Sequence, residues 1–140
     1  MEVHLILSED NRILGFANTA QPYTTAVEIS QSLFEELTTN GHEGYFLENG
    51  QIVKKQSYLD SLKQSDNLGH FRRWRSSVLA KYDILRQCAI NGDFDPNTGQ
   101  PYSAITEAEK QWRVAVLNFT DQITHETTEA DYPQPPERLR

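Results

Sequence analysis

The stretch FRRWRSSVLAKYDILRQCA, residues 71–89, decides the fold because its apolar residues return every three or four positions. The recurring residues are Phe71, Trp74, Val78, Tyr82, Leu85 and Ala89. This spacing places them on one face of an α-helix, which must be buried against another element. Upstream, apolar residues at 58, 59 and 62 predict that the helix begins near Ser57, with Gly69 as a candidate interruption, and Asn91-Gly92 supplies a stop.

A second helix is predicted within ITEAEKQWRVAVLNFTDQI, residues 105–123. Thr106 and Glu109 have the spacing of a capping box, which marks a helix start. Its apolar face is formed by Ala108, Trp112, Val116, Phe119 and Ile123. With residues 91–104 as the connecting loop, the two helices are expected to pack as an antiparallel hairpin.

The first 56 residues have the pattern of a β-rich unit that contains one helix. Short apolar runs at 2–7 and 12–16 predict a hairpin, and residues 26–29 are a candidate third strand. Ser30 is a suitable N-cap for a helix that Asn40-Gly41 would end, and Asn49-Gly50 is a strong signal for a second hairpin. The predicted fold class is therefore α+β, with a hairpin–helix–hairpin unit at 1–56, a helical hairpin at 57–124 and a tail at 125–140.

The predicted tail contains Tyr132-Pro133-Gln134-Pro135-Pro136 and shows no periodicity. It is expected to be extended and partly disordered. Two interpretations stay open. The segment is either a solvent-exposed terminus, or a docking segment of the kind that binds aromatic grooves with little loss of entropy.

Composition and charge limit the class of protein. Hydrophobic residues make up 37% of the chain, the mean hydropathy is −0.64, and no apolar run reaches the length of a membrane span. No secretory leader is expected, since the first apolar run lacks a basic lead. No internal disulfide is expected either, because Cys88 is the only cysteine, and it is predicted to be a buried thiol in a reducing cytoplasm. The net charge is −7 at residues 1–50, +5 at 51–90 and −5 at 91–140, which argues against general affinity for nucleic acid.

The basic cluster FRRWR has two interpretations. Binding of single-stranded nucleic acid would require exposed aromatic rings for stacking, whereas the helical periodicity uses Trp74 for packing. We therefore expect the indole to point inward and the arginines to lie in solvent, with Arg75 free to pair with a carboxylate across the hairpin. Arg72, Arg73 and Trp74 are candidates for contact with a protein partner, together with Tyr132, Pro133, Pro135 and Pro136 of the tail.

No pattern in the chain points to catalysis, a cofactor or a metal. The run DFDPNTGQ, which begins at Asp93, starts like a calcium loop, but Thr98 and Ala104 stand where that loop needs glycine and a bidentate acid. A tight turn explains it better, with Pro96 and Gly99 in turn positions. The four histidines have no metal spacing, and neither a phosphate-binding loop nor a nucleophile elbow is present. We expect no enzyme.

The order of these motifs resembles small tail-fibre assembly proteins and tail assembly chaperones of tailed phages and prophages. The resemblance is carried by Glu48-Asn49-Gly50-Gln51-Ile52-Val53, by Arg75, Val78-Leu79 and Asp83, by Thr106, Glu109, Trp112 and Asp121-Gln122-Ile123, and by Tyr132-Pro133-Gln134-Pro135-Pro136. It covers roughly residues 44–136. The family often has a Tyr-Arg pair in its second helix and a tail tryptophan, where this chain has Val116-Leu117 or nearby residues and Tyr132.

The resemblance implies a non-enzymatic protein that binds a tail fibre or receptor-binding protein and assists its folding or trimerisation. It would act in the cytoplasm of the bacterial host or stay on the virion, as a monomer or a homo-oligomer. A structural subunit of a tail or baseplate is the alternative, and a nucleic-acid-binding regulator that uses the basic middle of the chain is a second one.

Overall fold

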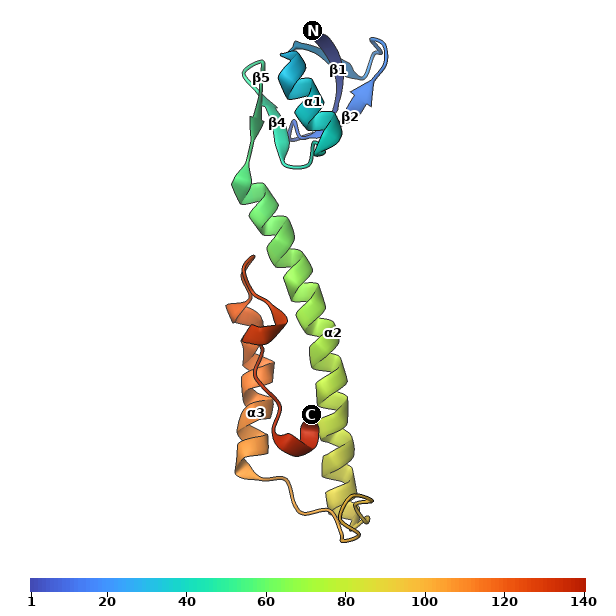
Figure 1. The fold of residues 1–140 in the computed structure, drawn as a ribbon, viewed down its shortest axis with the longest axis vertical. Helices are drawn as coiled ribbons and strands as arrows, with labels where there is room; N and C mark the ends of the chain where they lie inside the picture. Colours follow the sequence, from blue (N-terminus) through green and yellow to red (C-terminus); the bar gives the residue numbers. More distant parts are fainter. The chain divides into compact units, whose positions relative to one another are not determined.

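The computed structural model describes all residues, 1–140, and the chain divides into two compact units, Met1–Ser61 and Leu62–Arg140. The predicted α+β class is confirmed: five strands and a short helix precede the two long helices (Figure 1). The boundary between the units falls within helix α2, Gln56–Asn91. Each unit has its own hydrophobic core, and the two cores share no residue.

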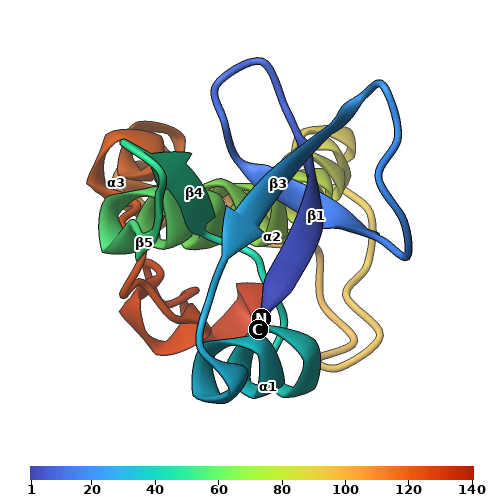
Figure 2. The same ribbon diagram turned by 90° about the horizontal axis from the view of Figure 1, so that it is seen from above.

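The first unit contains a three-stranded antiparallel sheet in the order β2-β1-β3. Its strands are β1 (Glu2–Leu7), β2 (Ile13–Ala17) and β3 (Thr24–Glu28), so both predicted strands and the candidate third one are present. Seen from above, β1 and β3 lie side by side with α1 nearby (Figure 2). The alternation of strand residues puts Val3 and Leu5 on the buried face of the sheet.

Helix α1 (Gln31–Thr39) covers that face and begins where the sequence predicts. The hydroxyl of Ser30 accepts a hydrogen bond from the backbone N–H of Leu33 at 3.1 Å, which satisfies a free donor at the helix start. The side chain of Leu37 then packs against the sheet core. The second hairpin pairs β4 (Tyr45–Glu48) with β5 (Gln51–Lys54). Its turn residues Asn49 and Gly50 both have positive φ, as a tight hairpin of this kind requires.

Two predictions about the helices of the second unit need correction. Helix α2 runs without interruption through Gly69, because two nearby residues, Leu68 just before it and Phe71 two positions after it, both pack on the core. Helix α3 (Glu107–Asn118) is shorter than predicted, and Phe119–Gln122 continues it as the tighter helix η1. The capping box of Thr106 and Glu109 is present as predicted.

The two helices of this unit are antiparallel, as predicted. Gln64 near the start of α2 contacts Ile123 beyond the end of α3, whereas Tyr82 farther along α2 stacks near Trp112 early in α3. The core between them contains Phe71, Val78, Tyr82, Leu85, Trp112, Val116, Phe119 and Ile123.

The segment after α3 is not the extended, partly disordered tail that the sequence predicts. It folds back along the α2–α3 pair, where Tyr132 contacts Trp74 of α2 and Pro133 contacts Trp112 of α3, and it forms two short helices, η2 (Glu129–Asp131) and η3 (Glu137–Leu139) (Figure 1). Tyr132 and Leu139 are 7% and 2% exposed and belong to the core. We call residues 125–140 the returning segment. It is buried because its two large apolar side chains fill the core that the two helices leave incomplete.

Candidate functional site

The basic cluster that the sequence singles out lies on α2 with its arginines and its indole on different sides. Arg72 and Arg73 are exposed, while Trp74 is half-buried. The indole packs on Phe71 and on Tyr132, at ring-centroid distances of 5.6 and 4.9 Å. The predicted orientation, with the indole inward and these two guanidinium groups in solvent, is thus what the structure contains.

Arg75 differs from the expectation. Instead of pairing with a carboxylate across the hairpin, its Nη1 donates to the hydroxyl of Thr120 at 3.1 Å, and its guanidinium lies 6.0 Å from the centre of the Phe71 ring. This contact links α2 to η1. The acceptor is an uncharged hydroxyl, and Arg75 forms no ion pair with a carboxylate of the chain.

The tail candidates are structural contacts of the protein itself rather than a free docking segment. The ring of Tyr132 packs on three aromatic residues, Phe71, Trp74 and Phe119. The indole N–H of Trp112 donates to the carbonyl of Pro133 at 3.1 Å. Pro135 accepts from the side chain of Arg140 at 3.1 Å, and Pro136 caps η3. The aromatic groove that suits a proline-containing segment is present, but this chain's own segment fills it.

An ion pair between the buried Glu109 and the partly exposed Arg138, which sequence reasoning missed, fixes the end of the returning segment. Arg138 donates from Nε and Nη2 to the two carboxylate oxygens of Glu109, at 2.5 and 2.6 Å, and also to the backbone carbonyls of Ser103 and Ala104. Glu109 also accepts from the backbone N–H of Thr106. The capping box could have identified Glu109, but nothing in the sequence pointed to Arg138 as its partner.

This pair has a clear electrostatic consequence. The hydrogen bond from Arg138 is the main cause that lowers the pKa of Glu109 to about 2, with smaller contributions from Thr106, while burial acts in the opposite direction. The same hydrogen bond raises the pKa of Arg138. Both groups therefore stay charged at neutral pH, and the carboxylate holds the helix start and the returning segment together.

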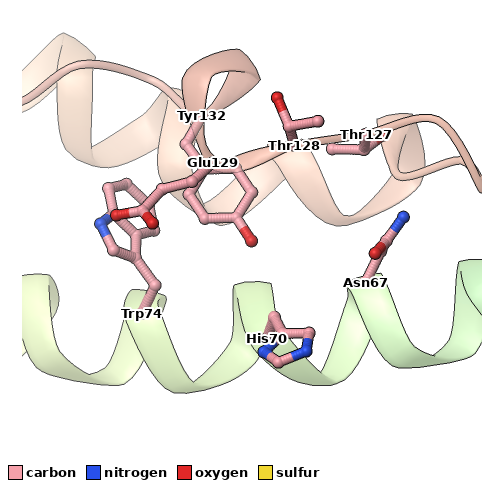
Figure 3. Close-up of a pocket in the computed structure, with 7 residues that line it drawn as sticks. All are labelled: Asn67, His70, Trp74, Thr127, Thr128, Glu129 and Tyr132. Carbon is pink, nitrogen blue, oxygen red and sulfur yellow. The ribbon is translucent and has the colours of Figure 1, made fainter.

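Trp74 and Tyr132 also line a hollow of about 240 Å³ on the side of α2 that faces the returning segment. Figure 3 shows Asn67, His70 and Trp74 on α2, with Glu129 and Tyr132 facing them. The side-chain amide nitrogen of Asn67 already donates hydrogen bonds within the protein, to the backbone carbonyls of Thr124 and His125 at 3.1 Å. The hollow thus has an aromatic wall and a polar rim.

The calcium-like run forms the turn that the sequence predicts. The carboxylate of Asp95 accepts a hydrogen bond from the backbone N–H of Asn97 at 2.8 Å, and Gly99 has a φ of 68°. No group of three His, Cys, Asp or Glu side chains is placed to hold a metal ion. Cys88 is half-buried and unpaired, somewhat less enclosed than predicted.

Comparisons with protein-family models, with curated proteins and with solved structures found no match to this chain. None of its helices combines the length and the apolar character that a membrane crossing requires.

Proposed function

We propose that this chain is an assembly chaperone or accessory protein for a phage tail fibre. It would bind a tail-fibre or receptor-binding protein in the cytoplasm of the bacterial host and assist its folding or trimerisation, without a catalytic residue or cofactor. The resemblance of the sequence motifs is the basis of the proposal.

One observation in particular supports it. The motifs that carry the resemblance are far apart in sequence, yet Trp112 of the second helix donates its indole hydrogen to Pro133 of the Tyr-Pro-Gln-Pro-Pro segment. A helix tryptophan and a proline segment that contact each other form one structural unit. The two motifs therefore support the resemblance together, because they are parts of one packing arrangement and not two separate short matches.

The proposal is also physically reasonable. Fibre subunits expose β edges and apolar seams before they trimerise, which makes them prone to aggregate. This chain offers free outer edges on β3 and β5, and its second unit carries the exposed side chains Ile84, Ile90 and Phe94. These side chains are candidate contacts for a fibre subunit.

Co-expression with the tail-fibre protein of the same phage or prophage tests the proposal. We expect more soluble fibre trimer and a complex on a sizing column. The variant Val116→Asp, which puts a charge at a fully buried core position, should abolish the effect, whereas Ala115→Asp on the exposed side of the same helix should keep it. No rise in trimer yield with the unmodified chain would contradict the proposal, and stoichiometric retention in purified particles would instead favour a structural subunit.

A further inference from the structure

The returning segment covers only one side of the helix pair α2–α3. Trp74, Lys81 and Cys88 are seven residues apart and so lie on one side of α2, where they line hollows together with the returning segment. Arg75 and Arg86 lie on another side of the same helix. There, Arg75 contacts Thr120 and Arg86 lines hollows with residues of α3, with no contribution from residues 125–140.

This open side contains two hollows that share Arg86. The first, of about 280 Å³, has an aliphatic floor and two cations, and is lined by Arg86, Ala89, Ile90, Ala104, Ile105 and Lys110. Ile90 is 63% exposed, so its apolar side chain is accessible to a ligand in this hollow. The second, of about 300 Å³, is lined by Tyr82, Asp83, Arg86 and Arg113. We call the two hollows together the open groove.

The charges of the open groove are not balanced within the protein. Arg86, Lys110 and Arg113 line it, and none of them forms an ion pair with a carboxylate of the chain. Asp83 is the single acid in its lining. The guanidinium of Arg113 lies 5.6 Å from the centre of the Tyr82 ring, which holds it in place before any ligand arrives. A chain of net charge −7 thus presents an uncompensated positive cluster beside an apolar floor.

We propose that the open groove binds an acidic segment of a partner polypeptide, with an aliphatic side chain on the floor around Ile90 and carboxylates against Arg86, Lys110 and Arg113. Arginine suits this task because its planar donors match a carboxylate. The inference deepens the proposed function and rests on it for the identity of the partner, which would be the fibre subunit. Nucleic acid fits less well, because the one aromatic ring in the lining, Tyr82, is buried and cannot stack on a base.

A peptide titration of the full chain, followed by amide chemical shifts, tests the groove without the fibre. The probe is an acetylated, amidated hexapeptide of alternating glutamate and leucine, and the control peptide has glutamine in place of glutamate. We expect the glutamate peptide to shift the amides of residues 86–90, 104–106 and 110–113, and the glutamine peptide to bind at least about tenfold more weakly.

Two variants with equal charge change make the test specific. Arg86→Glu with Lys110→Glu removes two cations of the open groove, and we expect peptide affinity to fall at least about tenfold. Lys63→Glu with Lys81→Glu makes the same change at exposed positions of α2 outside the groove, and should alter affinity less than about twofold. All four positions are exposed, so thermal unfolding should show that both variants fold.

Several results would overturn the inference: equal losses in the two variants, shifts located elsewhere, or stronger perturbation of the same amides by a short oligothymidylate. Self-association that Arg86→Glu with Lys110→Glu abolishes would place a second copy of this chain in the groove instead. The co-expression assay separates the two proposals. If the groove variant raises fibre trimer yield as well as the unmodified chain does, the groove is not the fibre site and the proposed function stands. If the unmodified chain has no effect, the proposed function fails while the peptide result is unaffected.

Discussion

Among single side chains, Glu109 has the most consequences for the second unit. One of its carboxylate oxygens accepts from the backbone N–H of Thr106 and from Nη2 of Arg138, and the other accepts from Nε of Arg138. The residue is only 2% exposed, so water cannot replace these partners. A helix start and a segment 29 residues away therefore depend on the same ionised group.

This arrangement predicts a specific pH dependence of stability. The folded-state pKa of Glu109, about 2, lies below its ordinary value of 4.5, so the folded protein disfavours protonation relative to the unfolded chain. The stabilisation should be fully present above about pH 5 and disappear as the pH falls toward 2, by up to about 3 kcal/mol. Urea unfolding from neutral to acidic pH measures it, with Glu109→Gln for comparison.

The difference in the free energy of unfolding between the unmodified chain and the Glu109→Gln variant separates the effect of Glu109 from that of the other carboxylates. The free energy of unfolding of the Glu109→Gln variant should be lower than that of the unmodified chain at neutral pH, because Arg138 loses its charged partner. The gap should narrow in acid. A gap that stays constant across the whole pH range would show that the ionisation of Glu109 contributes no stability.

Gly44 is a second position where one residue has a large effect. Its φ is +84°, and a Cβ atom built there would lie 2.7 Å from Cγ of Leu59, which is too close for any real contact. Gly41 offers a matched control, because its φ is +88° but nothing lies within 4 Å of the added atom. Gly41→Ala should cost only the backbone strain, about 1–2 kcal/mol.

We expect Gly44→Ala to lower the free energy of unfolding of the first unit by at least about 1 kcal/mol more than Gly41→Ala, since packing around Leu59 must also shift. Chemical unfolding followed by the exchange of core amides, such as that of Leu5, would measure both. Equal losses would mean that the first turn of α2 moves aside at no cost.

Among helices and strands, the features that the sequence predicts correctly are those with a local cause. The Ser30 cap, the Asn49-Gly50 turn and the Thr106 capping box each depend on residues within about three positions of one another. The periodicity of residues 71–89 likewise determines which side of α2 is buried, and so placed Trp74 correctly.

The features that sequence reasoning missed depend on contacts between distant residues. Tyr132 looks exposed in a proline-containing segment, and only the fold brings it to Phe71, 61 positions earlier in the chain. The partner of Glu109 and the groove around Arg86 were missed for the same reason. Four of the seven candidate site residues, those of the returning segment, therefore turned out to be structural contacts.

Gly69 illustrates how tertiary packing overrides a local preference. Glycine inside a helix costs about 1 kcal/mol relative to alanine, yet α2 continues through it. An added Cβ atom would meet only Nη1 of Arg73, at 3.8 Å, which is an ordinary contact. Gly69→Ala should therefore raise the free energy of unfolding of the second unit by up to about 1 kcal/mol. A loss of stability in urea unfolding would show that this position needs glycine for a reason outside the helix.

For the whole molecule, the separation into two cores has consequences for how the protein unfolds. The core around Leu5, Ile13 and Leu37 contains only residues of the first unit, and the core around Phe71 and Val116 only residues of the second. Both tryptophans of the chain, Trp74 and Trp112, belong to the second unit. Tryptophan fluorescence therefore reports on the second unit alone, while amide exchange of Leu5 reports on the first.

This division predicts that core substitutions act locally. Tyr132→Ala should lower the free energy of unfolding of the second unit by about 3–5 kcal/mol, because the ring packs on Phe71, Trp74 and Phe119. The unfolding midpoint seen by tryptophan fluorescence should fall accordingly. The substitution should leave the amide exchange of Leu5 unchanged. Gly44→Ala should speed the amide exchange of Leu5 and leave the unfolding midpoint seen by tryptophan fluorescence unchanged. Tyr132→Phe is the matched control: it keeps the ring, and the Tyr132 hydroxyl makes no hydrogen bond within the protein, so its midpoint should stay near that of the unmodified chain. If either core substitution shifts both probes together, the long helix α2 couples the two units into one cooperative transition, and the two cores do not unfold independently.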